Sequence, residues 1–230
     1  MKKTLIFVLA AIMVVAFAGV AFAKVSGSKH DLSSANYAGT GSNQVCVFCH
    51  HPHRGYVVPG GNVSNALLWN VDDFSQSSYS TYTNNSMNAV DNGTALTSTN
   101  SPQSFLCMAC HDGVISANSL VLPPGDGIDI PANKTLSGGA VLGTTLADDH
   151  PVNFTYTTDG GLAIPAAGVV TGVPSGNTYP LFAGLMQCGT CHDVHAGDTT
   201  SGTDSKSTAV GFMRGNIEYS QICTDCHTNK

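Results

Sequence analysis

The sequence predicts a chain that is mostly coil, with short helices at four copies of one motif and few short strands. Two observations carry this prediction. The five-residue motif Cys-x-x-Cys-His occurs four times and uses all eight cysteines of the 230-residue chain. The segments between the motifs are rich in glycine, serine, threonine and asparagine and show no sustained helical or strand period. The motifs run from Cys46 to His50, Cys107 to His111, Cys188 to His192 and Cys223 to His227.

The spacing of the motif has a geometric reason. Cysteines at positions i and i+3 with a histidine at i+4 lie on one face of a helical turn, so two thioethers hold one porphyrin edge while the imidazole reaches the iron. Zinc ribbons place no requirement on the residue after the second cysteine, and a disulfide scaffold does not keep every cysteine in pairs three apart. The sequence therefore predicts four closely packed covalent haem c groups that form much of the core. Their anchors are Cys46, Cys49, Cys107, Cys110, Cys188, Cys191, Cys223 and Cys226, and their proximal ligands are His50, His111, His192 and His227.

The N-terminus has the pattern of a secretory signal peptide. Lys2 and Lys3 precede an apolar run from Leu5 to about Ala18, and the small-residue pattern Ala21-Phe22-Ala23 follows. We expect residues 1–23 to be cleaved, with a membrane anchor as the alternative. No later segment is apolar for long enough to span a bilayer. We therefore expect residues 24–230 to form one exported domain, extracellular or at the cell surface, with the periplasm as the alternative location.

The charge of the chain argues against nucleic acid as a partner. Nine basic residues stand against fifteen acidic ones, a formal net charge of −6, and cleavage of the signal peptide removes two of the lysines. An acidic surface repels the phosphate backbone. An acidic surface ordinarily keeps a protein soluble, and it would also attract a small cationic redox partner.

An internal repeat assigns the remaining histidines. Each half, about 24–120 and 121–230, carries a histidine, then Cys-x-x-Cys-His-x-x-His, then a second Cys-x-x-Cys-His. The equivalent histidines are His30 with His150 and His53 with His195, which predicts bis-histidine iron at all four haems. His51 has no counterpart, so it is left to hydrogen-bond a propionate or to bind a neighbouring iron. The alternative for any of these side chains is an ordinary surface histidine.

The segments between the motifs predict little regular structure. We expect an exposed loop from Ser75 to Ser101, because serine, threonine and asparagine dominate it. From Val121 to Pro180, prolines and glycines allow only short strands or hairpins, for example at Val169-Val170-Thr171. A further short helix is expected near Gly211 to Ile222. No domain boundary is expected within the mature chain.

Several segments resemble the multihaem cytochromes with doubled Cys-x-x-Cys-His motifs. They are Ser28 to Ser33, Cys46-Val-Phe-Cys-His-His-Pro-His53, His150-Pro151-Val152 and Met213-Arg214 ahead of Ile222-Cys223-Thr-Asp-Cys-His227. The resemblance implies that the histidine three residues after a proximal ligand, His53 or His195, is the distal ligand of a neighbouring haem. His51 departs from the pattern, since a threonine or alanine is commoner before the proline.

In size, haem count and motif order the chain also resembles the extracellular tetrahaem cytochromes that polymerise into conductive filaments, or nanowires. That resemblance implies a homopolymer in which one distal histidine comes from the next subunit. His30 is the candidate for this role, because it follows the expected new N-terminus closely. The alternative is that His30 is a ligand within its own chain.

Three functions are open to such a chain. The first is extracellular electron transfer through low-potential haems to redox proteins or extracellular acceptors, with no catalytic residue. The second is a soluble periplasmic or secreted electron shuttle of the same chemistry. The third is a multihaem reductase, which requires one open iron site. The histidine count argues against the reductase, because five candidates cover four distal positions and no Cys-x-x-Cys-Lys variant occurs.

Overall fold

The computed structural model describes residues 25–33, 43–51, 68–71, 76–87, 89, 91–114, 120, 135–158, 161–173, 175–195, 212–215 and 220–228. The expected signal peptide at 1–23 and the candidate ligand His53 lie outside these residues. No helix among the described residues has the length and apolar character needed to cross a membrane.

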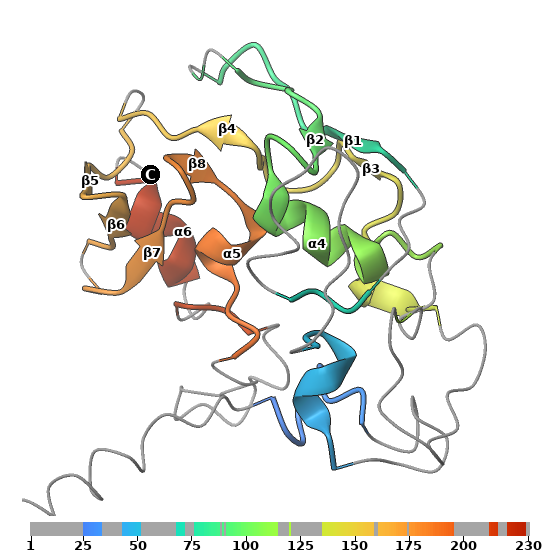
Figure 1. The fold of residues 1–230 in the computed structure, drawn as a ribbon. Helices are drawn as coiled ribbons and strands as arrows, with labels where there is room; N and C mark the ends of the chain where they lie inside the picture. The colour runs from blue at the N-terminus through green and yellow to red at the C-terminus, as the bar shows by residue number, and fades with distance from the viewer. Residues whose placement is uncertain are drawn as a thin grey trace, which may run out of the picture.

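The described part contains short helices, one at each cysteine motif, and three small sheets (Figure 1). The helices are the 3-10 turn η1 (Val45–Phe48), α4 (Pro102–His111), α5 (Cys188–Cys191) and α6 (Gln221–Cys226), with a further 3-10 turn η2 (Gly138–Ala140) away from the motifs. The longest, α4, begins with Pro102 in its first turn, where the missing amide hydrogen costs nothing.

The first sheet has the strand order β2-β1-β3 and packs against α4. Strand β1 (Ser78–Thr81) pairs antiparallel with β2 (Leu96–Thr97) and parallel with β3 (Thr145–Leu146). Side chains alternate along β1, so that Tyr79 is buried while its neighbours face outward. Tyr79 and the β2 and β3 leucines form an apolar cluster with Phe105 and Met108 of α4. This cluster fixes the helix that carries the second motif.

The other two sheets lie near the fourth motif. Strand β4 (Phe154–Thr155) pairs with β8 (Leu185–Met186), and β5 (Pro165–Ala166), β6 (Val169–Thr171) and β7 (Thr178–Pro180) form an antiparallel sheet. Figure 1 shows β6 and β7 beside α6. Inward-facing residues of these strands form a second apolar cluster, with Ile222 and Cys226 of α6 packed against it. The short strand expected at Val169-Val170-Thr171 is β6.

One expectation from the sequence is wrong in the described residues. The segment Ser75 to Ser101 is not wholly an exposed loop, because β1 and β2 lie within it and Tyr79 and Leu96 have 0% exposure. Here pairing with a distant segment overrides local composition. The helix expected near Gly211 to Ile222 lies partly outside the described residues; residues 212–215 form a turn and an isolated bridge, and α6 begins at Gln221.

Candidate functional site

Each Cys-x-x-Cys segment forms a helical turn that leads into its histidine. The His50 amide donates to the Cys46 carbonyl at 2.9 Å, the His192 amide to Cys188 at 3.0 Å and the His227 amide to Cys223 at 2.8 Å. The second motif, Cys107 to His111, completes α4. The i to i+4 bond places the imidazole directly after the two thiols on one side of the turn.

Three of the four motifs are held by the same backbone arrangement, which we call the clip. A clip is a three-residue segment that pairs antiparallel with the end of the motif, its middle residue opposite the motif histidine. The three bridges are His50 with Trp69, His192 with Met213 and His227 with Leu162. The residue before each middle residue has a positive φ: 52° at Leu68, 57° at Phe212 and 81° at Gly161.

Hydrogen bonds on both sides of the motif histidine close each clip. In the first motif, the His51 amide donates to Leu68 at 2.8 Å and the Asn70 amide to Cys49 at 2.9 Å. In the third, the Asp193 amide donates to Phe212 and the Arg214 amide to Cys191, both at 2.7 Å. The clip bonds of the fourth motif run from Thr228 to Gly161 and from Ala163 to Cys226, both at 2.8 Å. The clip therefore fixes the backbone of the motif histidine, which directly follows the helical turn.

The eight thiols are unpaired, and those of successive motifs lie close enough to affect one another. Burial raises the pKa of Cys110 to about 12, with the neighbouring Cys49 as the next cause. Burial likewise raises the pKa of Cys191 to about 11, with Cys226 next. Between these pairs, a hydrogen bond with the Cys107 thiol lowers the pKa of Cys188 to about 7, against the effect of its burial.

These interactions link the motifs in chain order. The Cys107 and Cys188 thiols of the second and third motifs are hydrogen-bonded, whereas Cys49 and Cys110, and likewise Cys191 and Cys226, influence each other only through their charges. Figure 1 shows α4, α5 and α6 side by side in the same order.

The second and third motifs, which belong to different halves of the internal repeat, are joined by reciprocal hydrogen bonds, which we call the clamp. The Ser104 amide donates to Gln187 Oε1 at 3.0 Å, and the Cys188 amide donates to Ser104 Oγ at 2.9 Å. The Gly189 amide donates to Gln103 Oε1 at 2.8 Å. Ser104 and Gln187 are both buried, so α4 and α5 meet through satisfied polar groups.

The predicted iron ligands have different surroundings. His111 Nδ1 lies 2.8 Å from the Ala140 carbonyl, and His150 Nδ1 lies 3.0 Å from the Pro151 carbonyl. A hydrogen bond at Nδ1 fixes the tautomer and leaves Nε2 for a metal. The rings of His50 and His195 are stacked with centroids 6.1 Å apart. A predicted proximal ligand of the first half thus lies beside a predicted distal ligand of the second half.

His30 lies inside its own chain. Its ring centroid is 4.4 Å from that of Phe212 and 6.0 Å from that of His111. Burial lowers the pKa of His30 to about 4, and the nearby His111, His192 and His195 act in the same direction. Its Nδ1 is buried and has no hydrogen-bond partner among the described residues.

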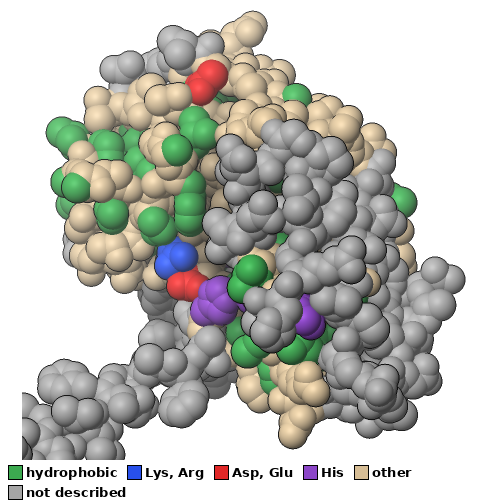
Figure 2. Space-filling model, in the orientation of Figure 1, with side chains coloured by type: hydrophobic (Ala, Val, Ile, Leu, Met, Phe, Trp, Pro, Cys, Tyr) green, Lys and Arg blue, Asp and Glu red, His purple; other side chains and the backbone are tan. Residues whose placement is uncertain are grey.

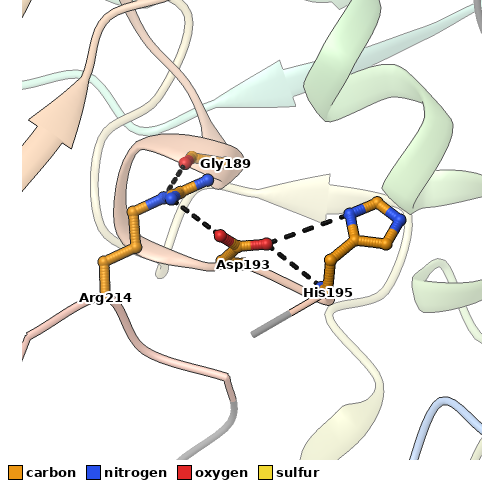
Figure 3. A network of polar contacts seen from close by, with 4 residues as sticks. All are labelled: Gly189, Asp193, His195 and Arg214. Atoms are coloured by element: carbon orange, nitrogen blue, oxygen red, sulfur yellow. Dashed lines mark hydrogen bonds and ion pairs between the residues drawn. The ribbon is translucent and has the colours of Figure 1, made fainter. Parts of the chain in front are cut away.

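His195 lies beside a carboxylate that is itself held by an arginine (Figure 3). Asp193 Oδ1 accepts the His195 amide at 3.1 Å and lies 3.9 Å from His195 Nδ1. Arg214 Nη1 donates to Asp193 Oδ2 at 2.9 Å, and Arg214 Nε donates to the Gly189 carbonyl at 2.8 Å. The other ring nitrogen of His195 points away from Asp193 (Figure 3). Figure 2 shows histidine, acidic and basic side chains gathered on this face.

Sequence reasoning missed the clips, the clamp and the role of Asp193. The first and third clips, Leu68-Trp69-Asn70 and Phe212-Met213-Arg214, share two apolar residues followed by a polar one. A comparison of the two halves of the repeat for that pattern would have found them. The clamp leaves no such signal, because its glutamines and serine resemble those of any loop.

Two further observations complete the site. No group of three or more His, Cys, Asp or Glu side chains among the described residues is arranged to hold a metal ion. No protein-family model matches the chain, and no curated protein is significantly similar to it.

Proposed function

We propose that this chain is an exported tetrahaem c-type cytochrome that transfers electrons and has no enzymatic activity of its own. The observation that carries the proposal is the fourfold repetition of two unpaired thiols and a histidine on one helical turn. Two thiols and one imidazole in this order are the donor set that covalent haem c requires.

Different residues of the chain would hold different parts of the cofactor. The paired cysteines anchor it, and His50, His111, His192 and His227 supply the proximal nitrogen. Among the distal candidates, His195 lies beside Asp193, whereas His30, His53 and His150 are assigned by the repeat. When bound, haem supplies a reversible one-electron couple at iron, whose potential histidine ligation keeps low relative to methionine ligation. The protein contributes spacing, ligand orientation and local polarity.

The contacts between motifs support a relay rather than four independent sites. The anchor thiols of successive motifs interact electrostatically in the order first, second, third, fourth, and the clamp joins the two halves at the middle of that order. A relay requires each cofactor to be near the next, and this order of the proposed anchors supports it.

For assembly we propose a head-to-tail homopolymer outside the cytoplasm, on the family resemblance. A head-to-tail contact runs on as a fibre unless its rotation closes a ring. The contacts of His30 with Phe212 and His111 support a ligand role within its own chain. Donation of His30 to the next subunit requires exchange of the segment 25–33.

Electron microscopy of the native secreted protein, with an absorption spectrum of the same sample, tests this proposal. Filaments with low-spin c-type haem are expected. Dispersed particles with the same spectrum would support the soluble shuttle instead, and a high-spin component would favour a reductase. His30→Ala then tests the ligand: folded tetrahaem protomers that fail to polymerise indicate donation, whereas filaments with one high-spin haem indicate a role within the chain.

A further inference from the structure

Asp225 is a buried carboxylate inside the fourth motif. It stands between Cys223 and Cys226 and has 0% exposure. The inner residues of the other three motifs are uncharged: Val47-Phe48, Met108-Ala109 and Gly189-Thr190. The fourth motif therefore differs from the others by one charge placed between the two haem anchors.

The two oxygens of Asp225 have unequal surroundings. Oδ2 accepts hydrogen bonds from Ser175 Oγ at 2.6 Å, from Asn177 Nδ2 at 3.4 Å and from Tyr179 Oη. All three donors belong to β7 or to the turn between β6 and β7. Oδ1 is also buried but has no donor among the described residues. Because an unsatisfied buried polar atom costs stability, its presence calls for an explanation.

The chain keeps the space for this carboxylate free of other side chains. A Cβ at Gly172 would lie 2.3 Å from Asp225 Cγ, and a Cβ at Gly215 would lie 2.1 Å from Tyr179 Oη. Glycine is thus needed at two separate positions in the sequence. The arrangement is a built pocket around one carboxylate and its phenol donor.

Asp225 directly precedes Cys226, one of the two proposed haem anchors of this motif. Burial raises the pKa of the Tyr179 phenol, and its hydrogen bond to Asp225 is the next cause. A fixed negative charge in a buried site favours the ferric over the ferrous state of a nearby haem, because the ferric form carries one more positive charge.

Resting on the proposed function, we propose that Asp225 lowers the reduction potential of the haem held by Cys223, Cys226 and His227. The donors on Oδ2 offset part of the charge, while the lack of a donor on Oδ1 leaves part of it uncompensated. Asp225 is thus a positioning and tuning residue and does not itself bind iron. The end of the relay nearest the C-terminus becomes more reducing than the motif alone would make it.

Spectroelectrochemical titration of the haem-loaded full chain tests this proposal. Asp225→Asn removes the charge and keeps an oxygen and nearly the same size, so one of the four potentials should shift upward while the other three stay unchanged. His227→Met marks the wave of this haem, since methionine in place of histidine raises the potential. Four unchanged potentials in Asp225→Asn would overturn the proposal, as would an upward shift of a different wave.

Two further variants leave the carboxylate in place, and they distinguish an effect of its charge from an effect on the folded structure. Tyr179→Phe and Ser175→Ala each remove a donor and leave more of the charge uncompensated, so the same potential should shift downward. If Asp225→Asn fails to load four haems, this downward shift carries the test. If these variants lower the unfolding midpoint but leave all four reduction potentials unchanged, the role of Asp225 is structural and the proposal is overturned. The haem count of the unmodified chain, measured in parallel, tests the proposed function separately.

Discussion

The surroundings of His195, a proposed iron ligand, depend on two other single residues. The Asp193 carboxylate lies near His195 Nδ1 and accepts a hydrogen bond from the His195 amide. Arg214 donates a hydrogen bond to the other oxygen of Asp193. The carboxylate leaves the second imidazole nitrogen directed away from the pair (Figure 3). The same division is found in metal-binding histidines, whose other ring nitrogen contacts a carboxylate or carbonyl.

Replacement of His195 tests its ligand role. In the haem-loaded chain, His195→Ala should convert one of four haems from low spin to high spin, because one iron loses its second imidazole. Absorption and electron paramagnetic resonance spectra measure this change. His51→Ala is the matched control, since the repeat gives His51 no counterpart, and it should keep all haems low-spin. An unchanged spectrum for His195→Ala would refute the assignment.

The sequence predicts individual residues where the chemistry is local. The proposed cysteine anchors and proximal histidines follow from spacing within one turn, and they stay predictions. Asp193 and Asp225 were missed, because their roles depend on Arg214 and Tyr179, which lie 21 and 46 positions away in the sequence. A charged residue inside or after a motif has no assignable role until its partners are known.

At the scale of elements, the clamp between α4 and α5 joins the two halves of the repeat. Ser104→Ala leaves the Cys188 amide without its acceptor, and Gln187→Leu does the same to the buried Ser104 amide. Each variant should lower the free energy of unfolding by about 1–3 kcal/mol in urea denaturation. Ser77→Ala, at an exposed serine outside the clamp, is the control and should have little effect.

The two clamp variants should also be coupled. Because they remove bonds of one network, the double variant should lose less stability than the two single losses added together. Additive losses would mean that the two hydrogen bonds act independently, and the clamp would then not be a unit.

The clips make a different prediction, through backbone strain. Leu68 and Phe212 occupy equivalent positions and both have positive φ, which costs a non-glycine residue roughly 1–2 kcal/mol. Leu68 is 38% exposed and Phe212 is 5% exposed. Leu68→Gly should therefore change the free energy of unfolding by no more than about 1 kcal/mol, because relief of strain offsets the added chain entropy.

Phe212→Gly relieves the same strain but also removes a buried aromatic ring that contacts His30. It should cost about 3 kcal/mol or more, as large core truncations do. Thermal unfolding of the two variants under the same conditions measures the contrast. Equal losses would contradict this account, because the difference in burial between Leu68 and Phe212 would then have no effect on stability.

Over the whole molecule, local signals predicted the motif turns, and tertiary pairing decided the rest. The turns form because each i to i+4 bond lies within one motif. Strand β1 was not predicted, since serine and threonine surround Tyr79 and the segment reads as a loop until Leu96 and Leu146 pack against it. The clips and the clamp join residues 17 to 86 positions apart in sequence, and no periodicity encodes such pairing.

The order of the motifs is the property of the whole molecule that matters most for its proposed function. The clamp joins the second and third motifs, and Asp225 is buried within the fourth. These features support the relay proposed above. They presuppose four covalent cofactors on one chain.

Counting those cofactors is the most direct test of the proposed relay. Intact mass spectrometry of the secreted protein, with an alkaline pyridine spectrum and electron paramagnetic resonance of the same sample, measures haem number, attachment and spin state. We expect a chain without residues 1–23 that carries four covalent haem c groups, all low-spin. Fewer than four covalent haems, or a chain whose eight cysteines hold zinc or disulfides, would contradict the proposal.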